Sequence, residues 1–164
     1  MSTTESTFGL SVIIALYLTI GFFTAAGSIY LSQTLFKPKW EQVFYGAFLI
    51  AVAGFYLAFN SHFGSENAWW TELSVVGLFT LTAGIGMRRV EVLIVGYLAH
   101  GIWDGIHEYN ELFAATGSDA LTPTPLAYGF FCAVYDVLMA AYFFTRRKQW
   151  RESWKASHSN LVAT

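Results

Sequence analysis

The sequence predicts an all-α protein: a bundle of five transmembrane helices with the N-terminus outside and the C-terminus in the cytoplasm. Three observations lead to this fold class. Only 12% of the 164 residues are charged, about half of the roughly 25% that water-soluble domains carry. The charged residues lie between long apolar runs, as they do in polytopic membrane proteins. Every basic residue lies at alternate ends of these runs.

Five apolar runs define the expected helices, because a helix needs about 20 apolar residues to cross a bilayer and at least about 17. The first and last runs meet this length, and the second is at the limit. The third and fourth reach it only with flanking residues such as Trp69, Trp70 and Ile106. The runs are continuously apolar, which disfavours transmembrane strands. In order, they are residues 8–31, 43–59, 73–87, 90–103 and 126–144.

The basic residues set the orientation. They follow the first, third and fifth runs, whereas the other ends of the runs contain no Lys or Arg. Under the positive-inside rule, the basic ends are cytoplasmic. The sequence therefore predicts a five-helix domain over residues 1–148 in the cell (inner) membrane, followed by a basic and aromatic cytoplasmic tail over 149–164. Trp150 and Trp154 of this tail would suit an anionic membrane face, although topological retention alone explains the basic residues more simply.

Ionisable residues at bilayer depth are concentrated in the last two runs. At 1.5 Å per residue, His100 lies about 15 Å from the cytoplasmic start of its helix, and Asp136 is about as deep in the next, antiparallel helix. Asp104 and His107 follow His100 on one helix face, because positions i, i+4 and i+7 share a face. An ionisable residue at this depth costs at least about 2.5 kcal/mol. We therefore expect these side chains to face the interior of the bundle.

The fifth run offers a matching face, on which Tyr128, Cys132 and Asp136 are four residues apart. If the two faces meet, Asp136 lies level with His100. A structural hydrogen bond that clamps the two helices is the alternative to a functional site. The first three runs hold no ionisable core residue other than tyrosine, so we expect no function for them. Solvated charges are expected at the outer end, namely Glu108, Glu111 and Asp119.

A pocket that opens to the outside and holds His100, Asp104 and Asp136 predicts acid–base chemistry on an apolar molecule. One carboxyl that keeps its proton acts as a general acid, while the histidine accepts a proton. Suitable reactions are double-bond isomerisation, epoxide opening or cyclisation of a small lipid or terpenoid-like molecule. The expected ligand-binding residues are Trp103, His107, Tyr128 and Cys132.

A metal ion is disfavoured, and no cofactor is predicted. His100 and His107 are separated by about 10 Å of helix rise, too far for one ion. The middle of the bundle offers three ligands, whereas a structural zinc takes four. A weaker candidate metal site lies at the outer rim, formed by His62, Glu66, His107 and Glu108.

Two other functions remain open. An accessory subunit of a larger membrane complex, as a homo- or hetero-oligomer, would use the polar pairs for assembly. A proton-coupled transporter is less favoured, because the inner half of the last two helices offers only Tyr97 and Tyr142, and because no internal repeat is present. The net charge of −2 gives no reason to expect nucleic acid. The expected partners are the lipid bilayer and a small hydrophobic molecule.

The stretch LAHGIWDGIHEYNEL and the later TPTPLAYGFFCAVYDVLMAAYFF together resemble a family of small integral membrane proteins of unknown function. The family pattern is a His-x3-Asp-x2-His segment, a proline-containing loop and a helix with Cys-x3-Asp. The family commonly carries a further histidine where this chain has Glu108, which argues against a metal. The resemblance implies no reaction. The matching positions are His100, Asp104, His107, Pro123 or Pro125, Cys132 and Asp136.

Overall fold

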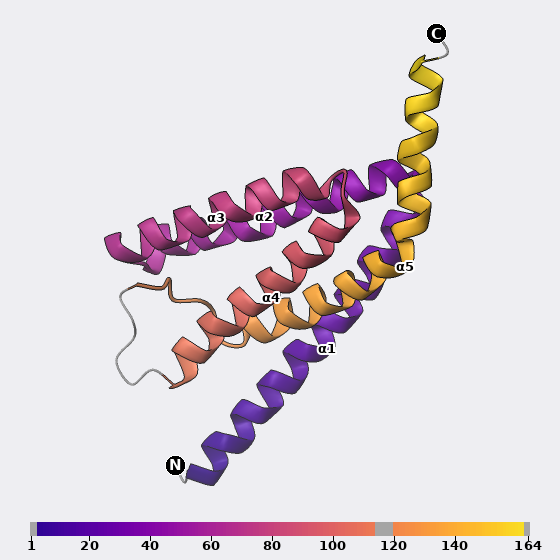
Figure 1. Ribbon diagram of the computed structural model, residues 1–164. Coiled ribbons are helices and arrows are strands. Elements are labelled where there is room, and N and C mark those ends of the chain that lie inside the picture. Colours follow the sequence, from indigo (N-terminus) through magenta and orange to yellow (C-terminus); the bar gives the residue numbers. More distant parts are fainter. Residues whose placement is uncertain (1–2, 114–119, 163–164) are drawn as a thin grey trace.

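The computed structural model describes residues 3–113 and 120–162, which form five α-helices (Figure 1). The predicted all-α fold is confirmed. Each predicted run lies within one helix, apart from one or two residues at the end of the third run and the start of the fifth. The helices are α1 (Thr3–Leu35), α2 (Pro38–Phe63), α3 (Glu66–Gly86), α4 (Val90–Phe113) and α5 (Tyr128–Val162).

Local sequence explains where the helices begin. Pro38 opens α2, because its fixed φ suits the first turn and its missing N–H needs no partner there. Ser65 precedes α3, and its side chain accepts a hydrogen bond of 3.1 Å from the Ala68 N–H, as expected of an N-cap. Short turns at residues 36–37 and 87–89 lie at one end of the bundle, called here the turn end. Residues 64–65 and 120–127 lie at the opposite end, called the loop end (Figure 1).

The helices pack unequally. In Figure 1, α2 runs beside α3, and α4 packs along α5, while α1 lies against α5 and has few contacts with α2. Glycines allow close approaches between α5 and two of its neighbours. A Cβ on Gly21 of α1 would lie 2.6 Å from the Phe131 carbonyl oxygen, and one on Gly101 of α4 would lie 3.2 Å from the Asp136 Cβ. The helix pairs α1–α5 and α4–α5 are therefore tight, whereas α1 and α2 leave space between them.

Helix α5 continues through residue 148 without a break, and its C-terminal part turns away from its first part (Figure 1). The Trp150 side chain is fully buried, and its Nε1 donates a hydrogen bond of 2.8 Å to the Glu41 carboxylate. Trp154 Nε1 donates to the Gln42 side chain at 3.1 Å. Both indoles therefore bind the start of α2, so packing within the bundle accounts for them.

Four segments are long and apolar enough to cross a membrane: Phe8–Leu35, Pro38–Phe63, Glu66–Gly86 and Tyr128–Ser157. Helix α4 is not among them, since its 24 residues carry the ionisable side chains described above. Large apolar side chains nevertheless face outward on every helix, for example Phe23, Leu81 and Ile102, which are 67%, 69% and 66% exposed. Such a surface is compatible with a membrane protein.

Candidate functional site

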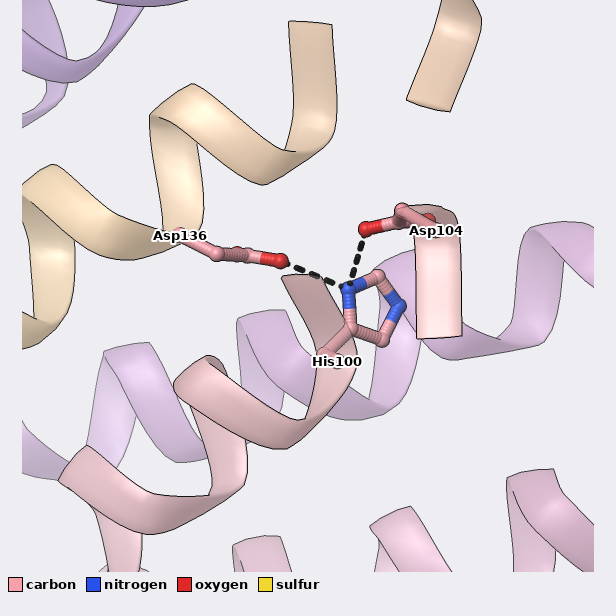
Figure 2. Close-up of side chains that lie close together, drawn as sticks. All are labelled: His100, Asp104 and Asp136. Carbon is pink, nitrogen blue, oxygen red and sulfur yellow. Dashed lines mark hydrogen bonds and ion pairs between the residues drawn. The ribbon is translucent and has the colours of Figure 1, made fainter. Parts of the chain in front are cut away.

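His100, Asp104 and Asp136 meet in the buried interior between α4 and α5 (Figure 2). His100 Nδ1 lies 2.8 Å from Asp136 Oδ2 and 3.0 Å from Asp104 Oδ2. The polar face of α4 thus meets that of α5, and the close approach at Gly101 brings His100 and Asp136 together. We call these three residues, together with Tyr56, the site cluster.

Helix α2 contributes Tyr56, a residue that sequence analysis missed. Its hydroxyl donates a short hydrogen bond to Asp104 Oδ1. Tyrosine is common in membrane helices, so only the tertiary contact distinguishes Tyr56 from its neighbours. This bond fixes the orientation of the Asp104 carboxylate toward His100.

Within residues 3–113 and 120–162, the buried His100 Nε2 has no hydrogen-bond partner. Asp104 Oδ2 and Asp136 Oδ2 both contact His100 Nδ1. That nitrogen carries at most one hydrogen, so at most one of the two carboxylates accepts a hydrogen bond from it. An unsatisfied buried polar atom costs about 1–3 kcal/mol. Buried polar groups in native proteins are almost always paired, but Glu72 Oε2, Trp103 Nε1 and Thr124 Oγ1 are further exceptions among the described residues. The unpaired His100 Nε2 therefore carries weight only together with the cavity that His100 lines.

A cavity of about 200 Å³ ends on the site cluster. Its wall is mostly aromatic and aliphatic, and the exposed Thr24 and Phe55 form its rim. Its ionisable members are His100 and Asp136, with the Cys132 thiol and the hydroxyls of Tyr128 and Tyr135 nearby. The lining residues are Thr24, Phe48, Val52, Phe55, His100, Tyr128, Phe131, Cys132, Tyr135 and Asp136.

The position of this cavity corrects the expected pocket between the fourth and fifth helices. The cavity lies between α1, α2 and α5, and His100 is the α4 residue in its lining. The physical reason is that α4 and α5 approach too closely at Gly101 to leave space, whereas α1 and α2 diverge. Of the expected ligand-binding residues, Tyr128 and Cys132 line the cavity, but Trp103 and His107 do not.

His107 binds α3 instead. The imidazole is buried, and its Nε2 lies 2.7 Å from Glu72 Oε1, while its Nδ1 lies 3.1 Å from the Trp103 carbonyl oxygen. Glu72 Oε1 also accepts a hydrogen bond of 3.2 Å from the Thr122 N–H. Glu72 was missed because it stands at the edge of an apolar run, where a carboxylate is expected to reach water. His107 and Glu72 join α3, α4 and the loop before α5.

The prediction that Glu108 is a solvated charge is wrong. Its side chain is buried, and its two oxygens accept hydrogen bonds from the N–H groups of Ala127 at 3.1 Å and Gly129 at 2.9 Å. The carboxylate therefore caps the N-terminus of α5, where unpaired N–H groups and the helix dipole favour negative charge. Glu111 is exposed, as predicted. Asp119 lies outside the described residues.

The expected outer-rim metal residues do not converge. His62 and Glu66 are exposed, whereas His107 and Glu108 are engaged as described. Among residues 3–113 and 120–162, the group of three or more potential ligands is His100, Asp104 and Asp136, whose ligand atoms lie within 4.8 Å of one another.

A further buried carboxylate lies at the turn end. Glu41 is fully buried, and its oxygens accept hydrogen bonds from Ser32 Oγ at 3.2 Å, Arg146 Nη2 at 2.7 Å, Trp150 Nε1 at 2.8 Å and the Tyr142 hydroxyl. We call these five residues the turn-end cluster. Sequence analysis missed it because Glu41 stands beside Lys37 and Lys39, which made it look like part of a charged surface turn.

Residues 24–149 match the profile of a family described as a family of unknown function (DUF6010). The match covers most of the chain, well beyond the last two helices on which the resemblance rested. No curated protein and no solved structure matches the chain.

Proposed function

The chain belongs to this family of unknown function, DUF6010, and we propose that it is a membrane-embedded protein that carries out acid–base chemistry on a small hydrophobic molecule. The observation that carries the proposal is the apolar cavity that ends on His100 and Asp136. Binding sites for small molecules combine an apolar wall with a few polar groups in this way.

The membrane topology is part of the proposal. All five helices cross the bilayer, with the N-terminus outside and the C-terminus in the cytoplasm. The turn end then faces the cytoplasm and carries the basic residues. Support comes from the four long apolar helices and from α4, which has 24 residues and buries the ionisable groups along its middle, namely His100, Asp104, His107 and Glu108.

A labelling experiment tests this topology. A cysteine introduced at the exposed Ser61 is expected to react with a membrane-impermeant maleimide on intact cells. A cysteine at Lys148 is expected to react only after the membrane is opened. The buried Cys132 of the unaltered chain provides the unreactive control. Equal labelling of both positions on intact cells would refute the topology.

His100 and Asp136 reach the cavity, so they are the proposed catalytic residues. For double-bond isomerisation, protonated Asp136 gives its proton to one carbon of the double bond. His100 removes a proton from the carbon beyond the other end, so that the double bond shifts by one position. The proton then returns to Asp136 across the 2.8 Å contact. Epoxide opening and cyclisation require the same initial proton transfer. Positioned proton transfer of this kind typically accelerates a reaction by about 10²–10⁴-fold.

Asp104 and Tyr56 are positioning residues in this scheme. Asp104 does not line the cavity, but its contact with His100 at 3.0 Å and its bond from Tyr56 hold the imidazole in place. Cys132 and Tyr128 lie on the α5 side of the cavity, where they contact the bound molecule.

The direct test compares the purified protein with Asp136→Asn and His100→Ala. Each protein, reconstituted in lipid nanodiscs, is incubated with an apolar extract of the source membranes, and the products are compared by untargeted mass spectrometry. We expect a product that forms with the unaltered chain, and with Glu111→Gln as the matched surface control, but falls at least about 10²-fold in both site variants. Unchanged products in both site variants would end the proposal. A stable heteromeric complex without a bound small molecule would favour an accessory subunit instead.

A metal-dependent form of the same site is the second candidate. It is favoured by the three converging ligand atoms and by the approach of both Asp carboxylates to the same His100 nitrogen. Catalytic zinc sites commonly use three protein ligands and leave a fourth position open. Elemental analysis of the purified protein distinguishes the two forms. If elemental analysis finds about one divalent ion per chain, and the ion is lost in Asp104→Asn, the metal-dependent form is correct and the metal-free scheme is not.

A further inference from the structure

We propose that the site takes a molecule with a linear hydrocarbon chain, acyl or isoprenyl, whose tail lies in a second cavity between α1 and α2. This second cavity has a volume of about 160 Å³. The inference rests on the proposed function only in placing the reactive end of the molecule at His100 and Asp136.

The two cavities are neighbours. Phe48 of α2 and Tyr135 of α5 line both of them, so the two spaces adjoin at these side chains. The second cavity continues toward the turn end and is lined by Ser28, Leu31, Ser32, Leu35, Phe36, Phe44, Phe48 and Tyr135.

The chemistry of the second cavity suits a hydrocarbon tail rather than a second polar group. Its hydroxyls already have partners within the protein: Tyr135 donates to Ser28 Oγ at 3.3 Å, and Ser32 donates to Glu41 at 3.2 Å. The remaining lining is aliphatic and aromatic. Ionisable groups therefore meet the ligand only at the far end, at His100 and Asp136, which fixes the direction in which the molecule lies.

The size of the two spaces indicates the length of the chain. A cavity of about 150 Å³ lined by apolar side chains holds one benzene molecule. Each of the two cavities is of this size, so together they accommodate roughly ten to twelve carbon atoms. A compact ring system would fill one cavity only, whereas a linear chain passing between Phe48 and Tyr135 fills both.

The hydrocarbon chain enters the cavities through the side of the bundle, between α1 and α2. Leu31 and Leu35 line the second cavity and are 57% and 64% exposed, and the exposed Thr24 and Phe55 form the rim of the first. Both openings lie between α1 and α2, the helices that contact each other little. A chain dissolved among bilayer lipids enters there without crossing water.

Photolabelling of the full chain in nanodiscs tests this inference. The probes are linear alcohols with a diazirine at the terminal carbon, on alkyl chains of six and twelve carbons and on an isoprenyl chain of similar length. We expect the terminal carbon of the twelve-carbon or isoprenyl probe to label the second cavity, around Leu31, Leu35 and Phe44. The six-carbon probe is expected to label the first cavity, around Phe55 and Phe131.

Two variants make the labelling decisive. Leu31→Trp fills the second cavity and is expected to reduce long-probe labelling there at least fivefold. Leu16→Trp, on the same helix but lining neither cavity, is expected to leave it unchanged. Labelling spread evenly over the outward faces of α3 and α4 would show surface lipid only and would overturn the inference. If the labelling holds but no product forms, the proposed chemistry fails and the binding site stands. If product forms but the second cavity is not labelled, the proposed chemistry stands and the inference about the hydrocarbon tail fails.

Discussion

The turn-end cluster and the site cluster are both buried, and both contain carboxylates, but they differ in how completely their polar atoms are hydrogen-bonded. Glu41 accepts hydrogen bonds on both oxygens, and Arg146 balances its charge. In the site cluster, Asp104 and Asp136 share one nitrogen of the His100 imidazole, and His100 Nε2 has no partner among the described residues. Burial alone therefore does not distinguish a structural carboxylate from a reactive one. The two clusters differ in that Glu41 has partners on both oxygens, whereas the His100 imidazole keeps a buried nitrogen without a partner among the described residues and lines a cavity.

The two clusters also differ in their surroundings. Glu41 joins α1, α2 and α5 through Ser32, Tyr142 and Trp150, so its bonds hold three helices together. The site cluster borders a cavity on one side, where a bound molecule can reach His100 and Asp136. We therefore expect the turn end to contribute stability, and we place the proposed chemistry in the middle of the bundle. Three substitutions, one in each cluster and one at the loop end, compare how much each region contributes to stability.

The largest loss of stability is expected at the turn end. Glu41→Ala leaves Arg146 without its partner in a mostly buried position, and breaking a buried ion pair in this way costs about 3–5 kcal/mol. Glu152→Ala is the matched control, because its contact with Lys148, at 4.0 Å, is exposed and such pairs contribute about 0–1 kcal/mol. Unfolding of the detergent-solubilised protein, followed by circular dichroism, measures both. Equal losses in the two variants would contradict a structural role for Glu41.

An intermediate effect is expected at the loop end. Glu108→Gln weakens the charged acceptor that caps the α5 N-terminus at Ala127 and Gly129. Hydrogen bonds to charged groups contribute about 1.5–3 kcal/mol, so we expect a loss of about 1–2 kcal/mol. Hydrogen exchange should become faster at these two amides first. The exposed Glu111→Gln is the control, and equal exchange rates in the two variants would argue against the cap.

The smallest change in stability, and one of opposite sign, is expected in the site cluster. Asp104→Asn keeps an oxygen that accepts from Tyr56 and removes one of the two carboxylates that compete for His100 Nδ1. We expect the free energy of unfolding to stay the same or to rise by about 1 kcal/mol, because functional polar groups are commonly kept at a cost in stability. Thermal unfolding in nanodiscs measures it. A loss above about 2 kcal/mol would make the cluster structural and remove its contrast with Glu41.

The sequence by itself determined which segments are helical and how far along their helices the site residues lie. Apolar run length is a local feature, so each helix was located from it, but α3 begins seven residues before its run, and α4 and α5 continue ten and eighteen residues beyond theirs. The spacing of His100 and Asp104 on one face, and the matched depth of Asp136, placed three residues that the structure brings into contact. Helical rise and period suffice for this, because both are fixed by the backbone.

Only the tertiary structure decided where the cavity lies and which further residues join the clusters. The tight contacts at Gly21 and Gly101 set α1 and α4 against α5, and the remaining space opens beside α2. Glu41, Tyr56 and Glu72 each bind at least one partner more than forty residues away, namely Tyr142, Asp104 and Thr122. Run length and periodicity describe one helix at a time. The pairing of distant side chains depends on how closely the helices pack, and a single sequence does not contain that distance.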